Sequence, residues 1–166
     1  FKELNPEDNY IIAPQAQSKF YIQPAFKHVG ASWLTKENTI NETENVMRYF
    51  DAVLETEKIS NDKNIIVVGY SQGVSVAMRY IRSRQLYCNQ LVLMSGGIPK
   101  ELVADDFKFL RDTKITMIYG TEDEFLNAER IQLESNRIAE LFGDKATIIP
   151  FEGKHIVNVE LINNLV

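Results

Sequence analysis

The sequence is poor in the residues that disulfide and metal chemistry require, with one cysteine and two histidines among 166 residues. The single cysteine, Cys88, excludes an intramolecular disulfide and every metal site built from several thiolates. It is also typical of a protein kept in a reducing compartment, so we expect a cytoplasmic location. His28 and His155 are isolated from any other histidine or cysteine. We therefore expect no metal and no organic cofactor, and a metal-dependent hydrolase is a poor fit.

An excess of basic charge and long apolar runs are missing too. The net charge is −5, with 18 Lys and Arg against 23 Asp and Glu, which argues against a nucleic-acid-binding face. No apolar run approaches the length of a membrane span, and no segment resembles a signal peptide. The sequence therefore points away from nucleic acid and from a membrane span, and toward a small-molecule substrate.

What the chain does have is a regular alternation of strand and helix patterns. Short apolar runs predict strands at 10–13, 65–68, 90–94, 115–119 and 145–151. Apolar residues at three- and four-residue spacing predict helices at 39–60, 72–84 and 126–142, with helical segments also at 1–5 and 156–166. Residues 14–40 show no period and are interpreted as a folded surface loop. This order predicts one α/β domain over residues 1–166, with a mostly parallel sheet covered on both faces by crossover helices.

The most informative segment runs from Gly69 to Gly73 and reads Gly-Tyr-Ser-Gln-Gly. It lies between the β-branched run Ile65–Val68 and a helical pattern, which is the context of a nucleophile elbow. The tight turn strains Ser71, and we expect both glycines to provide the lack of bulk that the turn needs. A phosphate-binding loop is a weaker interpretation, because no Lys-Ser or Lys-Thr pair follows.

An acidic segment and a histidine follow later strands. The strand at 115–119 leads into Gly120-Thr121-Glu122-Asp123-Glu124, and the last strand leads to Gly153-Lys154-His155. The carboxyl ends of parallel strands meet at one edge of a sheet, so these loops are expected to converge on Ser71.

A serine hydroxyl needs a neutral imidazole to accept its proton, and a carboxylate must orient that imidazole. His155 is the predicted base, because His28 precedes the elbow and lies in the irregular loop. Three adjacent acids compete for the orienting role. Asp123 is preferred for its reach beyond Gly120, and Glu122 is the alternative.

Together these segments resemble the α/β-hydrolase superfamily, and within it the small carboxylesterase, lysophospholipase and acyl-protein thioesterase group. The resemblance rests on six segments, namely Ile12-Ala13-Pro14-Gln15-Ala16, Gly30-Ala31-Ser32-Trp33, Gly69 to Gly73, Leu93-Met94-Ser95-Gly96, Gly120 to Asp123 and Gly153-Lys154-His155. It implies a three-layer α/β-hydrolase-like fold with Ser71 as nucleophile, Asp123 as acid and His155 as base. The Gly-x-x-Asp spacing in the acidic loop strengthens Asp123 over its neighbours.

The resemblance also implies that the first strands and an oxyanion loop are absent, so that the domain is partial. The backbone N–H of Gln72 is then one oxyanion donor, with its partner upstream of Phe1. The implied activity is hydrolysis of an ester or thioester through an acyl-enzyme. A peptidase or acyltransferase on the same fold, or a non-catalytic ligand-binding homologue, are the alternatives. Phe26 and Trp33, in the aromatic loop, are candidate contacts for an apolar part of the substrate.

Overall fold

The computed structural model describes residues 3–60 and 63–165, which divide into two compact units. The sheet unit contains residues 3–9 and 64–165, and the hairpin unit contains the described residues between Tyr10 and Lys63. The sequence-based prediction of a single domain stays a prediction.

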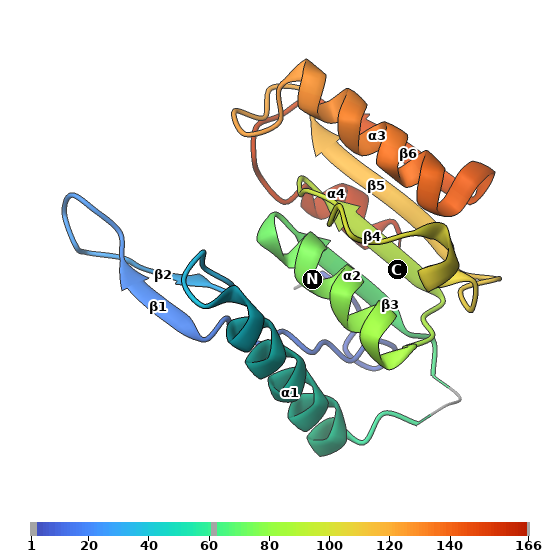
Figure 1. Ribbon diagram of the computed structural model, residues 1–166, viewed down its shortest axis with the longest axis horizontal. Helices are drawn as coiled ribbons and strands as arrows, with labels where there is room; N and C mark the ends of the chain where they lie inside the picture. The colour runs from blue at the N-terminus through green and yellow to red at the C-terminus, as the bar shows by residue number, and fades with distance from the viewer. Residues whose placement is uncertain (1–2, 61–62, 166) are drawn as a thin grey trace. The chain divides into compact units, whose positions relative to one another are not determined.

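The sheet unit is built on four parallel strands in the order β3-β4-β5-β6 (Figure 1). Their bounds are Ile66–Tyr70 for β3, Gln90–Met94 for β4, Lys114–Gly120 for β5 and Ala146–Phe151 for β6. All four were predicted from their apolar runs within one or two residues. Because all three pairings are parallel, the four carboxyl ends lie at one edge of the sheet.

The two faces of the sheet are covered differently. Helices α2 (Gln72–Arg84) and α3 (Ala128–Phe142) share one apolar core with alternate residues of the strands, including Leu91 and Met117. The intervening strand residues, such as Val92 and Ile118, pack with Ile162 of α4 (Val159–Asn163) in a second core.

The predicted α/β class is confirmed, but crossover helices were expected on both faces. Both crossover α-helices belong to the first core, and the second core is completed by α4, which follows the last strand. The connection from β4 to β5 carries only the 3-10 segment η1 (Ala104–Phe107).

The hairpin unit corrects two sequence-based predictions. The run Tyr10–Ala13 was expected to be a strand but forms none, and Tyr10 is 78% exposed. The region interpreted as a loop instead contains the antiparallel strands β1 (Ser18–Tyr21) and β2 (Val29–Ser32). Phe20 pairs with Gly30, where an added Cβ would lie 2.7 Å from the Phe20 ring. The glycine therefore makes room for the aromatic ring, a cross-strand fit that no local pattern reveals.

Helix α1 (Thr39–Glu57) follows the hairpin and was predicted from its apolar stripe. It ends at Glu57, before the predicted end at 60. Its N-cap is Asn38, which has a left-handed conformation and makes no side-chain capping bond. Its residue Phe50 stacks on Trp33 with ring centroids 5.2 Å apart.

The boundaries of the remaining helices differ modestly from those predicted from the sequence. Gly143 ends α3 with a φ of 58°, a backbone conformation that favours glycine. The C-terminal helix is only five residues long. Glu3–Asn5 form a turn and bend where the end of a helix was expected, and the first two residues of that segment lie outside the described residues.

Candidate active site

Ser71 occupies the junction between β3 and α2 in a strained backbone conformation, with φ 53 and ψ −122. L-residues adopt such positive φ angles at a cost of about 1–3 kcal/mol, which the surrounding structure must supply. The Ser71 N–H donates to the Met94 carbonyl at 2.9 Å, so the end of β4 helps to hold the turn. The elbow predicted from Gly69–Gly73 is thus formed at the predicted strand-to-helix junction.

The glycines around the turn do not all serve the expected purpose. A Cβ on Gly69 would lie 2.7 Å from the Val74 backbone, which agrees with the prediction. Apart from its chain neighbours and the nearby backbone of α2, a Cβ on Gly73 would meet no described atom within 4 Å, so the predicted need for a glycine there is wrong for the described structure. The tightest approach was missed by the sequence analysis, since a Cβ on Gly96 would lie 2.2 Å from the Ser71 carbonyl oxygen.

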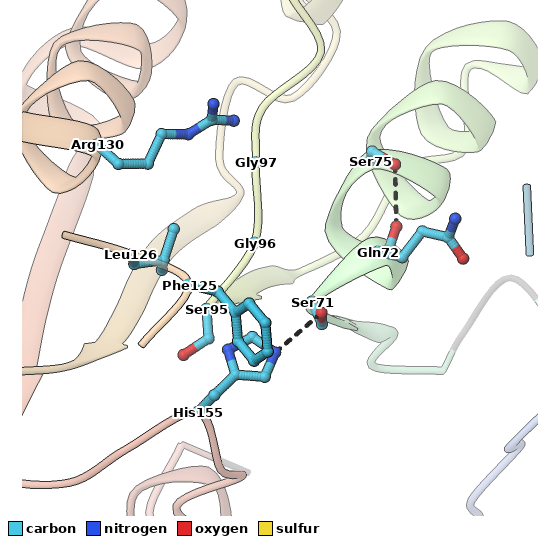
Figure 2. A pocket seen from close by; sticks show the side chains of 10 residues that line it. All are labelled: Ser71, Gln72, Ser75, Ser95, Gly96, Gly97, Phe125, Leu126, Arg130 and His155. Atoms are coloured by element: carbon cyan, nitrogen blue, oxygen red, sulfur yellow. Dashed lines mark hydrogen bonds between the residues drawn. The ribbon is translucent and has the colours of Figure 1, made fainter. Parts of the chain in front are cut away.

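His155 joins Ser71 to Asp123 through its two ring nitrogens. Its Nε2 lies 3.0 Å from Ser71 Oγ, drawn as a dashed line in Figure 2, and its Nδ1 lies 2.8 Å from Asp123 Oδ2. A carboxylate accepts hydrogen bonds, so Nδ1–H donates to Asp123 and leaves Nε2 free to accept from the Ser71 hydroxyl. The loops after β3, β5 and β6 therefore bring together the three side chains that the sequence grouped.

The Asp123 carboxylate is buried and held at both oxygens. Its side chain is 0% exposed, and its Oδ1 accepts from the Phe125 N–H at 2.9 Å. Burial alone would raise its pKa. The hydrogen bonds from His155 and Phe125, the charge of the imidazolium and the nearby Ser95 hydroxyl outweigh burial and lower the pKa below the usual Asp value. The carboxylate is thus kept ionised, as an orienting acid must be.

The neighbouring acids have other environments. Glu122 and Glu124 are exposed, and only the Glu124 carboxylate contacts His155, accepting from its backbone N–H at 3.4 Å. Of the three adjacent carboxylates, Asp123 alone bonds the His155 ring. The geometry favours Asp123 over the alternative Glu122.

Two aromatic rings hold His155, and the sequence analysis identified neither. Phe125 contacts the imidazole edge to face, with ring centroids 4.9 Å apart. The ring centroid of Tyr70 lies 5.1 Å from that of the imidazole. The Tyr70 hydroxyl donates to the His155 carbonyl at 2.8 Å. Burial, with the charges of Asp123 and Glu124, raises the pKa of Tyr70, which favours its protonated, donating form. Tyr70 is the variable residue of the elbow motif, and its position beside Ser71 was the only signal available.

A cavity of about 390 Å³ lies over the serine and the histidine. Figure 2 shows its lining, which is Ser71, Gln72, Ser75, Ser95, Gly96, Gly97, Phe125, Leu126, Arg130 and His155. Gln72 begins α2, so its backbone N–H is at the positive end of that helix. Trp33 and Phe26 belong to the hairpin unit, in which Trp33 packs on α1 and Phe26 is 56% exposed.

Residues 3–60 and 63–165 contain no cluster of three or more His, Cys, Asp or Glu side chains placed to bind a metal ion. Within the same ranges, no helix has both the length and the apolar character needed to span a bilayer.

The structure thus combines a parallel sheet with a strained serine that lies between a strand and a helix and faces a histidine. The chain belongs to the FSH1 serine hydrolase family, whose profile matches residues 5–159. No curated protein gave a sequence match.

Several solved structures share the fold. Acyl-protein thioesterase 2 from Zea mays is 14% identical, with a TM-score of 0.63 over 92% of this chain and 76% of that chain. SOBER1 from Arabidopsis thaliana is 18% identical, with a TM-score of 0.61 over 92% of this chain and 78% of that chain. The carboxylesterase of Bacillus cereus is 18% identical, with a TM-score of 0.56 over 78% of this chain and 60% of that chain. At these identities the likeness concerns the fold, and it agrees with the predicted α/β-hydrolase-like architecture.

Proposed function

We propose that this protein hydrolyses carboxylic esters or thioesters through a covalent acyl-Ser71 intermediate. The observation that carries the proposal is the continuous path from the buried Asp123 carboxylate through the His155 ring to the strained Ser71 hydroxyl. Membership in a serine hydrolase family, and the fold shared with a thioesterase and a carboxylesterase, support the same reaction class.

In the acylation step, His155 Nε2 takes the Ser71 proton as Oγ attacks the carbonyl carbon of the substrate. Asp123 stabilises the imidazolium that results, because its carboxylate already accepts from Nδ1. The imidazolium then protonates the leaving alcohol or thiol, and the bond to the leaving group breaks. Water, activated by His155, releases the acid and restores Ser71.

The negative charge that develops on the carbonyl oxygen needs a donor near Ser71. The backbone N–H of Gln72 serves this role in the proposal, because it follows the nucleophile directly and begins a helix of thirteen residues. A backbone donor needs no reorganisation during the reaction, so its contribution is available at the moment the charge forms.

The first experiment is hydrolysis of p-nitrophenyl butyrate by the wild-type protein and by Ser71→Ala. We expect the variant to lose activity by several orders of magnitude. Ser83→Ala is the matched control, because Ser83 lies on the same helix, its hydroxyl donates to the Tyr80 carbonyl three residues earlier, and it does not line the cavity. Hydrolysis that persists in Ser71→Ala would remove Ser71 as the nucleophile.

The proposed contacts of Trp33 and Phe26 with an apolar part of the substrate are tested separately. Trp33→Ala and Phe26→Ala are compared with wild type on p-nitrophenyl acetate, butyrate and octanoate. A preference for longer chains that falls in either variant supports the contact. An unchanged preference removes it, and Trp33 then serves only its packing on α1.

A further inference from the structure

Arg130 lies on the wall of the catalytic cavity, and neither the proposed mechanism nor the packing of the sheet requires a cation there. It belongs to the first turn of α3 and lines the cavity together with Ser71 and His155. Figure 2 shows its side chain extending from α3 toward the loop of Gly96 and Gly97. A Cβ added at Gly97 would lie 2.6 Å from Arg130 Nη2, so the guanidinium lies directly against this backbone.

Arg130 is held in place by a buried carboxylate. Its Nε forms an ion pair with Glu134 Oε1 at 2.5 Å, and the Glu134 side chain is 2% exposed while that of Arg130 is 43% exposed. The other oxygen, Oε2, accepts from the Ile98 N–H at 2.8 Å. The Glu134 carboxylate thereby joins α3 to the loop after β4 and holds the Arg130 guanidinium at its Nε. Within the described residues, the two terminal Nη groups donate no hydrogen bond to the protein.

A second cavity of about 530 Å³ adjoins the first and shares Arg130, Gly97 and Ser75 with it. Four basic side chains line this second cavity against two acidic ones, namely Arg79, Lys100, Arg130 and Arg137 against Glu101 and Glu134. This excess of positive charge is found in a chain whose net charge is −5. Three of the four are in ion pairs, Arg79 with Glu101 at 2.7 Å, Arg130 with Glu134 at 2.5 Å and Arg137 with Glu140 at 2.5 Å. Among the described residues, the excess of positive charge around this cavity therefore comes from Lys100, with the outer edge of the Arg130 guanidinium facing the same space.

We propose that Arg130 determines specificity by binding an anionic group, a carboxylate or a phosphate, carried by the ester or thioester substrate. The inference rests on the proposed function, and it names the substrate class that this site prefers. A guanidinium held at Nε presents its two Nη groups as a fork, which matches the paired oxygens of a carboxylate or phosphate. The scissile carbonyl then lies at Ser71, and the anionic group extends past Gly97 into the second cavity.

The anionic group can belong either to the acyl part of the substrate or to its leaving group. Two matched pairs of ligands distinguish these two cases. Monomethyl glutarate and dimethyl glutarate differ by a carboxylate on the acyl side. Butyryl-4′-phosphopantetheine and butyryl-pantetheine differ by the phosphate of the leaving thiol. Binding is measured by calorimetry in the Ser71→Ala background, so the ligands are not consumed.

We expect one anionic ligand to bind roughly 10- to 100-fold more tightly than its neutral partner, which is the effect of hydrogen bonds to a charged group. Arg130→Gln should remove this preference and leave binding of the neutral ligand unchanged. Arg82→Gln is the control for loss of a cation, because Arg82 pairs with Asp106 and lines neither cavity. Arg82→Gln should keep the same preference for the anionic ligand over the neutral one as the Ser71→Ala protein.

Arg130→Gln leaves the Glu134 carboxylate buried without its partner, so the double variant Arg130→Gln/Glu134→Gln is measured beside it. The amide oxygen that Glu134→Gln introduces can still accept from the Ile98 N–H, and loss of preference in either folded variant supports the proposal. Equal binding of anionic and neutral ligands, or a preference that survives both variants, overturns it. Hydrolysis of the neutral thioester by the wild-type protein is recorded in parallel. Its absence would count against the proposed function, while binding still decides the role of Arg130.

Discussion

Replacing Asp123 by asparagine should reverse the direction of one hydrogen bond and thereby disable His155. The Phe125 N–H donates to Oδ1, so the amide oxygen of an asparagine takes that place and its NH₂ group faces His155 Nδ1. The imidazole must then accept at Nδ1 and carry its proton on Nε2. In that tautomer Nε2 cannot accept the proton of Ser71, although every heavy atom keeps its position.

The loss expected from this tautomer is about 10⁴-fold in kcat, or about 5.4 kcal/mol at 1.36 kcal/mol for each factor of ten. The assay is the hydrolysis of p-nitrophenyl butyrate by Asp123→Asn, with folding checked by circular dichroism. Glu122→Gln is the matched control, because it removes an adjacent exposed carboxylate and should leave kcat unchanged. An Asp123→Asn variant within tenfold of wild type, or an equal loss in Glu122→Gln, would refute the assignment of Asp123.

Three further predictions concern stability and reactivity. Gly96→Ala should lower the free energy of unfolding in urea by about 1–3 kcal/mol, because the added Cβ meets the Ser71 carbonyl. Gly73→Ala, in the helix, should raise it by up to about 1 kcal/mol. Equal effects of the two substitutions would contradict the steric reason. Burial raises the pKa of the Cys88 thiol to about 11, although a hydrogen bond with Thr113 acts in the opposite direction. The native thiol should therefore not react with Ellman's reagent at pH 8, and it should react fully after unfolding. The lowered pKa of Asp123 means that its ionised form contributes stability above the ordinary value of about 3.9, and this contribution is lost as pH falls through the folded-state pKa. The difference in unfolding free energy between wild type and Asp123→Asn should therefore shrink between pH 7 and pH 3, and a constant difference would contradict the shift.

The part of the site that depends on strand order was predictable from the sequence. Ser71, the acidic segment and His155 each follow a parallel strand, and parallel strands end at one edge, so their convergence follows from topology. The choice of Asp123 over Glu122 was less secure, because it depends on which carboxylate is buried against the imidazole.

Other features depend on contacts between distant residues. The loop at Ser95 and Gly96 has no titratable group, yet its backbone allows the elbow to close. The hairpin was missed because the fit of Phe20 over Gly30 is a cross-strand contact without local periodicity. Arg130 in a helix reads as a solvated charge until Glu134 is known to be buried behind it.

The central claim is that Ser71 Oγ forms a covalent bond with the acyl group of an ester. The most direct measurement is peptide mass spectrometry after the protein is mixed with p-nitrophenyl acetate and quenched in acid, with a fluorophosphonate as a second label. We expect an added acetyl or phosphonyl mass on the peptide that contains Ser71, abolished in Ser71→Ala and retained in Ser83→Ala. An adduct on another residue, or a wild-type protein that turns over the ester while Ser71 remains unlabelled by both reagents, would contradict it.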